Sequence, residues 1–130
     1  MIGGRVLDTS AVVQFASNTS VYMQSAVWVA LEEALVLAIP GTSLAEAWAQ
    51  TDPADHDALD VLLGLPITVV DALDAAQARS VGQILTAAPA AGVRAGHVAH
   101  VARRRGWPVI TAAPEQLRRV ELALDIEELP

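Results

Sequence analysis

The strongest constraint on this chain is the alternation of short apolar runs with longer, alanine-rich stretches. The short runs stand at residues 5–7, 36–39, 67–70 and 107–111, and segments with helical spacing of apolar residues lie between them. Strands that alternate with helices build a parallel sheet that is covered by helices on both faces. We therefore predict an α/β fold, a three-layer α/β/α sandwich with a mainly parallel central sheet.

Capping and turn residues give the expected bounds of the helices. We predict helices over residues 11–16, 21–34, 43–50, 52–63, 74–86, 93–105 and 114–120. Thr9 or Ser10 is expected to cap the first helix, Asp71 or Asp74 the fifth, and Gly106 to end the sixth. A last strand at the edge of the sheet is predicted at 122–126. No linker divides the chain, so residues 1–130 are predicted to form a single domain.

Composition excludes several classes of protein. Hydrophobic residues make up 53% of the 130 residues, which is enough for a packed core and too many for a disordered chain. No run of apolar residues is long enough to span a membrane, and the first ten residues lack the pattern of a signal peptide. Cysteine is absent, which removes disulfides and thiolate metal sites. We therefore expect a cytoplasmic protein.

The charged residues narrow the chemistry further. The net charge is −7, which argues against a broad basic face that wraps nucleic acid. All eight basic residues are arginines, so mechanisms that need a lysine are excluded. Five of them lie late in the chain, at 103–105 and 118–119. These five form either a solvated helix face or a patch that binds phosphate or an acidic partner.

Asp8 is the most informative acidic residue, because it directly follows the buried run 5–7. In parallel sheets, ligands bind outside the carboxyl ends of the strands, where this side chain would lie. A carboxylate there can cap the next helix, or it can be an oxygen ligand for Mg²⁺ or Mn²⁺. The adjacent Thr9 and Ser10 can also cap, which makes a dedicated cap at Asp8 less necessary.

Glu46 is the second acid that could serve such a site. It has capping-box spacing with Ser43, which is one interpretation of its role. The other is that its carboxylate points back toward the strand ends, near Asp8. His97 and His100 share a helix face and could bind a metal ion, but two histidines without a third nearby ligand are more typical of partly exposed helical positions.

Other α/β enzymes fit the chain poorly. Receiver domains need a lysine, which this chain lacks. Phosphatase-like sites need an Asp-x-Asp signature, and here Ser10 stands in place of the second aspartate. No Gly-x-Ser-x-Gly elbow is present, which excludes the α/β-hydrolases.

Three segments together resemble the PIN domain, the fold of the VapC-type toxin ribonucleases. Residues 6–13 (VLDTSAVV) resemble its opening strand and helix, and 43–47 (SLAEA) resemble its second acidic motif. Residues 97–111 (HVAHVARRRGWPVIT) resemble its closing helix and strand. The segments follow the family's order and span nearly the whole chain.

This resemblance implies a cluster of three or four carboxylates that hold Mg²⁺ or Mn²⁺. Asp8 matches the first acid and Glu46 the second, so both are predicted as catalytic residues and metal ligands. Ser10 and Thr111 match polar positions that line the same site. The third and fourth acids would fall on Ala95 and Ala113, which coordinate nothing. His97 and Glu115, each two residues beyond an alanine, are predicted as weaker supporting residues.

Two functional hypotheses follow from this resemblance. The first is a divalent-metal-dependent endoribonuclease with a reduced acidic site. The alternative is a catalytically deficient PIN-like module that binds RNA or an antitoxin-like protein without cleavage. The resemblance also implies a homodimer, and the lack of a long apolar run predicts no association with membranes.

Overall fold

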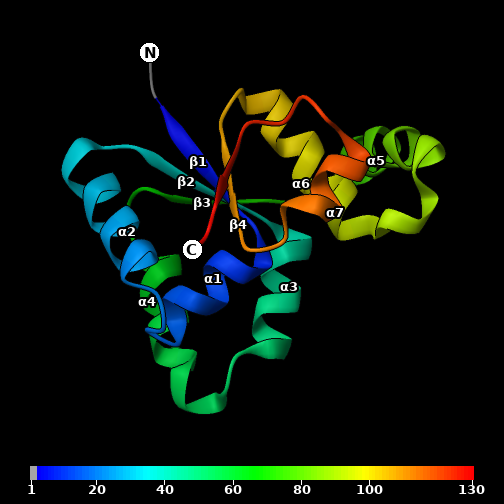
Figure 1. The fold of residues 1–130 in the computed structure, drawn as a ribbon. Helices are drawn as coiled ribbons and strands as arrows, with labels where there is room; N and C mark the ends of the chain where they lie inside the picture. Colours follow the sequence, from blue (N-terminus) through cyan, green and yellow to red (C-terminus); the bar gives the residue numbers. More distant parts are fainter. Residues whose placement is uncertain (1–2) are drawn as a thin grey trace.

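Five strands form one parallel sheet in the computed structural model, which describes residues 3–130 (Figure 1). The strand order is β3-β2-β1-β4-β5, and all four pairings are parallel. The strands are β1 (Gly4–Leu7), β2 (Val36–Pro40), β3 (Thr68–Asp71), β4 (Val109–Thr111) and β5 (Ile126–Glu128). The predicted α/β class and parallel sheet are confirmed.

Seven α-helices connect and cover the strands. They are α1 (Thr9–Ala16), α2 (Val21–Glu33), α3 (Gly41–Gln50), α4 (His56–Gly64), α5 (Ala75–Ala87), α6 (Gly92–Arg105) and α7 (Pro114–Val120). Two short 3₁₀ turns, η1 (Pro53–Asp55) and η2 (Pro89–Ala91), precede α4 and α6. Within residues 3–130, none of these helices has the length and apolarity that crossing a bilayer requires.

The sheet separates two apolar cores, because successive side chains of a strand point to opposite faces. Leu7, Ile39 and Ile110 face one core, which α1 to α4 complete. Val6 and Val109 face the other core, which α6 and α7 complete. Figure 1 shows α1–α4 on one side of the sheet and α5–α7 on the other, which confirms the three-layer sandwich.

Two predicted boundaries and one predicted cap were wrong. The last strand lies at Ile126–Glu128, not 122–126, because residues from 121 on form a turn before the chain reaches β4. The helix predicted at 52–63 is the 3₁₀ turn η1 followed by α4, and the Asp52 side chain makes no capping bond. Asp8, not Thr9 or Ser10, is the N-cap of α1. Asp74 caps the start of α5 and Gly106 ends α6, as predicted.

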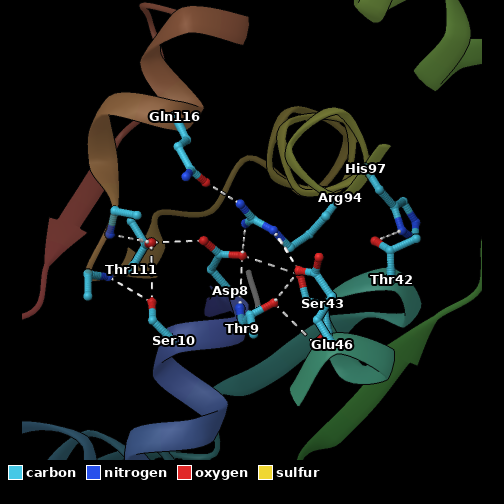
Figure 2. A network of polar contacts seen from close by, with 12 residues as sticks. Asp8, Thr9, Ser10, Thr42, Ser43, Glu46, Arg94, His97, Thr111 and Gln116 are labelled. Atoms are coloured by element: carbon cyan, nitrogen blue, oxygen red, sulfur yellow. Dashed lines mark hydrogen bonds and ion pairs between the residues drawn. The ribbon is translucent and has the colours of Figure 1, made fainter. Parts of the chain in front are cut away.

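The carboxyl ends of β1, β2 and β4 meet at one edge of the sheet. β1 ends at Leu7, β2 runs directly into α3 at Gly41, and β4 ends at Thr111. The first turn of α6 lies above this edge, beside α3 and α7 (Figure 2). Residues from four separate segments therefore converge there.

Candidate functional site

Asp8 is the centre of the polar network at this edge (Figure 2). It is buried, with 2% of its surface exposed, although it is an acid. Its Oδ1 accepts hydrogen bonds from the Thr9 backbone N–H at 2.8 Å and from the Ser43 hydroxyl at 3.4 Å. Its Oδ2 accepts one from the Thr111 hydroxyl at 2.8 Å. The capping interpretation of Asp8 is therefore confirmed, and its role as a metal ligand stays a prediction.

Glu46 lies close to Asp8, as predicted, but the predicted capping box with Ser43 does not form. α3 begins at Gly41, so Ser43 lies inside the helix and its hydroxyl donates to Asp8 instead. The Glu46 carboxylate turns toward the strand ends, where its Oε2 accepts a hydrogen bond from the Thr9 hydroxyl at 3.1 Å. Its side chain is about half exposed, so the site opens to solvent on this side.

Arg94 joins the two acids, and sequence reasoning did not identify it. Its Nη1 lies 2.5 Å from Asp8 Oδ1, and its Nε lies 2.8 Å from Glu46 Oε2. Its Nη2 donates to Gln116 on α7. Only 16% of the Arg94 side chain is exposed. Figure 2 shows its guanidinium between the two carboxylates, so a fixed positive charge stands where both acids point.

Ala95, the position predicted for the third acid, lies elsewhere. Its side chain is fully buried in the core beneath α6, with Val98 and Ala102 on the same helix face. One residue along an α-helix is a rotation of about 100°, so Arg94 and Ala95 face different surroundings. Whether Ala95 corresponds to the family's third acid stays a prediction, but the residue that faces the carboxylates is Arg94.

The hydroxyls of Ser10 and Thr111 complete the network, in agreement with their predicted place. They lie 3.4 Å apart, and each accepts a backbone N–H of the segment that follows β4. Ala113, the position predicted for the fourth acid, borders the site and contributes only a methyl group. An open hollow of about 300 Å³ lies here, lined by Asp8, Thr9, Ser10, Glu46, Gln50, Arg94, Ala113 and Gln116.

The two supporting residues predicted from sequence lie outside this network. Glu115 is exposed on α7 and does not line the hollow, whereas its neighbour Gln116 does. His97 is fully buried, not partly exposed, and its Nδ1 lies 2.9 Å from the Thr42 hydroxyl. Its Nε2 has no hydrogen-bond partner in the described part of the chain.

The donor set does not fit a divalent cation as the network stands. Residues 3–130 contain no group of three His, Asp or Glu side chains placed to hold an ion. The two carboxylates that do converge already bind a guanidinium. The arrangement therefore matches a closed ion pair with hydroxyl support better than an open acidic cluster.

Comparison with solved structures identifies the architecture. No family model matches the chain, and no curated protein sequence matches it. A structure of VapBC2 from Rickettsia felis bound to a DNA fragment from its promoter matches with a TM-score of 0.74 and 16% identity, over 100% of both chains. DNA-bound VapBC from Salmonella typhimurium matches with a TM-score of 0.72 and 21% identity, over 98% of each chain. This chain has the PIN-domain fold. The predicted resemblance is confirmed at the level of the fold.

One sequence signal could have pointed to Arg94 within the PIN fold. Ala95, Val98, Ala99 and Ala102 have the spacing of a helix face that packs on a sheet, and all four are buried. That stripe already assigns Ala95 to the core. The residue just before it, at the start of the helix, is then the one free to reach the strand ends.

A second buried acid, Asp71, lies at the end of β3 and is not part of this site. Arg105 binds it through Nε and Nη2, each at 2.9 Å, and Arg104 Nη2 lies 2.7 Å from its Oδ1. Burial alone would raise the pKa of Asp71, but the hydrogen bonds and charges of Arg105 and Arg104 outweigh it and hold that pKa below its ordinary value. Asp71 therefore fixes the C-terminal end of α6 to the edge strand.

The two histidines of α6 should make the protein less stable in mild acid. Burial lowers the pKa of His97, and burial with Arg104 and Arg103 lowers that of His100. An unfolded histidine takes up a proton near pH 6.5, whereas these two resist until lower pH, so acid favours the unfolded chain. We expect the free energy of unfolding in urea to fall between about pH 7 and about pH 5.

His97→Gln should flatten this dependence, and His100→Gln should flatten it less because His100 is less buried. Equal slopes for the wild type and both variants would show that these histidines titrate normally in the folded state.

Proposed function

We propose that this chain is a VapC-like PIN-fold module that binds partners without cleaving RNA. The observation that carries this proposal is the position of Arg94. A PIN-fold nuclease would need its converging acids free to hold Mg²⁺ or Mn²⁺. Here the acids Asp8 and Glu46 bind a guanidinium that belongs to the chain itself.

Charge repulsion gives this proposal its physical basis. A divalent ion held by Asp8 and Glu46 would lie within a few ångströms of the Arg94 guanidinium. Two unit charges 4 Å apart repel by about 4 kcal/mol in a protein-like dielectric, so a divalent ion would meet roughly twice that. Ala113 adds no ligand to offset this repulsion. Arg94 would have to leave both carboxylates before an ion could bind well.

The comparisons suggest what this module binds. The two structures named above are of VapBC bound to DNA. We propose that this chain likewise pairs with a small antitoxin-like protein in the cytoplasm and forms a homodimer. RNA contact without cleavage is compatible with the same fold.

The test is Mn²⁺-dependent cleavage of single-stranded RNA by the purified chain. We expect no cleavage above a no-protein control, and no Mn²⁺ binding by calorimetry tighter than about 1 mM, corresponding to about 4 kcal/mol. Asp8→Asn and Glu46→Gln are the matched variants, because each keeps the shape of the side chain and removes one charge. Cleavage by the wild type that both variants abolish would contradict the proposal.

That outcome would instead support a second function, a metal-dependent ribonuclease with a two-acid site. One observation favours it: Asp8 and Glu46 converge on a single group, with the hydroxyls of Ser10 and Thr111 nearby. They could converge on an ion in the same way if the partly exposed Arg94 swung outward. Mg²⁺ is often held by one or two carboxylates with water as the remaining ligands.

A further inference from the structure

A polar hollow between α5 and α6 lies at the opposite end of α6 from Arg94. It is lined by Ser80, Gln83, Ile84, His100, Arg103 and Arg104, and has a volume of about 540 Å³. Arg104 follows Arg94 by ten residues, which is about 15 Å along a helix axis. We call this the α5–α6 hollow. It contains two of the late arginines that the sequence singled out.

The arginines of this hollow carry more positive charge than their acidic neighbours neutralise. Arg105 already gives Asp71 two hydrogen bonds, so Asp71 has a full partner without Arg104. Arg104 contributes only its Nη2 to Asp71, and its side chain is 45% exposed. Its other N–H groups stay available, since a guanidinium has five.

Arg103 is less engaged by acidic residues than Arg104 is. Its side chain is 59% exposed, and its nearest acid, Glu121, lies 3.6 Å away, which is a weak surface pair. α5 contributes no charged residue to the lining, only Ser80, Gln83 and Ile84. The hollow therefore has a net positive charge on a chain whose overall charge is −7.

His100 reports this positive potential. Burial is the largest cause that lowers the pKa of His100. The positive charges of Arg104 and Arg103 lower that pKa further, and the negative charge of Asp71 opposes them. An anion in the hollow would offset the two arginines, so it would raise the pKa of His100. Protonated His100 would in turn strengthen the binding of that anion.

We propose that the α5–α6 hollow binds a phosphate group through Arg103 and Arg104, with His100 and Ser80 completing its hydrogen bonds. Planar guanidinium groups match the paired oxygens of phosphate, and a hydroxyl and an imidazole supply the further donors. The Ser80 hydroxyl is free to turn, because its hydrogen bond to the Ala76 carbonyl is long at 3.4 Å. The volume suits a group the size of a nucleotide. This inference does not depend on the proposed loss of cleavage at Asp8.

The test is an NMR titration of the full chain with sodium phosphate, adenosine 5′-monophosphate and a short single-stranded RNA. We expect the ring signals of His100 to shift and the pH midpoint of His100 to rise as phosphate binds. Arg103→Gln with Arg104→Gln should weaken binding by about tenfold or more, since two charge-assisted contacts are lost. Ser80→Asp should do the same without touching the Asp71 ion pairs.

The matched control is Arg118→Gln with Arg119→Gln, which removes the same charge from the exposed face of α7. It should leave phosphate affinity within about twofold of the wild type, as surface charges at a distance are screened. Equal weakening by both double variants would mean general charge attraction and would overturn the proposal. Absence of any shift at His100 with all three probes would overturn it as well.

The three probes also distinguish the source of the phosphate. RNA that binds more tightly than the mononucleotide, and that Ser80→Asp weakens, assigns the hollow to a nucleic-acid strand. A mononucleotide that binds as tightly as the RNA assigns it to a free nucleotide. RNA binding that Ser80→Asp leaves unchanged places the RNA elsewhere and removes it as the ligand of this hollow.

Discussion

Arg94→Asp will give this chain an affinity for Mn²⁺ that the wild type lacks. The change removes a positive charge from between Asp8 and Glu46 and adds a third carboxylate on the same face of α6. Three acids with nearby hydroxyls form the oxygen-rich set that Mn²⁺ and Mg²⁺ prefer. We expect Mn²⁺ affinity, measured by calorimetry, to increase by about a hundredfold or more, because the change reverses a repulsion of several kcal/mol.

The matched control for this result is Arg79→Asp. Arg79 is exposed on α5, and the substitution makes the same change in net charge far from the two acids. Arg94→Gln adds a second comparison, since it removes the positive charge without adding an acid, and its affinity should fall between the other two. If Arg94→Asp and Arg79→Asp bind Mn²⁺ alike, Arg94 does not control the site. Wild-type affinity equal to that of Arg94→Asp would lead to the same conclusion.

The sequence was sufficient to predict the sheet and the place of Asp8. Both follow from local patterns: an apolar run marks a buried strand, and the residue that ends it lies at the carboxyl edge. The last strand was predicted at the edge of the sheet, but the bounds of the short β5 could not be predicted in the same way. Its residues Glu127 and Glu128 are acidic, and it exists because Ile126 pairs in register with Val109 of β4. Pairing between distant segments is not encoded in the pattern of either segment.

The side chains of the site were harder to predict than its backbone. Ser43 and Glu46 have the spacing of a capping box, but α3 starts directly after Pro40 and places Ser43 inside the helix. Its hydroxyl then points to Asp8, which lies between β1 and α1. The spacing of Ser43 and Glu46 did not predict their hydrogen-bond partners, because tertiary packing determines which groups these side chains meet.

Arg94 shows the same limit more sharply. The resemblance drew attention to Ala95, but the side chain that lies between Asp8 and Glu46 is that of its neighbour, Arg94. A step of one residue changes the facing of a helical side chain by about 100°, which here separates the core from the site. The alanine alone predicted only a missing ligand, whereas the structure places a cation beside the two acids.

The stability of the Asp8→Asn variant shows whether the site is a closed ion pair or an open cluster of acids. Carboxylates crowded together without a cation repel one another, so replacing one of them by an amide would stabilise the fold. In this structure Asp8 instead accepts four hydrogen bonds, one of them from the positively charged Arg94. We expect Asp8→Asn to lower the free energy of unfolding by about 3 kcal/mol, because the half-buried Arg94 loses the buried one of its two acids.

Asparagine caps a helix about as well as aspartate, so this loss would not come from the start of α1. The matched control is Asp60→Asn, a change of the same kind at an exposed position of α4, which should alter stability by less than about 0.5 kcal/mol. Urea unfolding at neutral pH measures both variants. The double variant Asp8→Asn with Arg94→Gln should recover part of the lost stability, because no guanidinium is then left short of an acid and the exposed Glu46 stays hydrated. A stabilising effect of Asp8→Asn would mean that Asp8 and Glu46 repel each other in solution, and that the site is open to a metal ion.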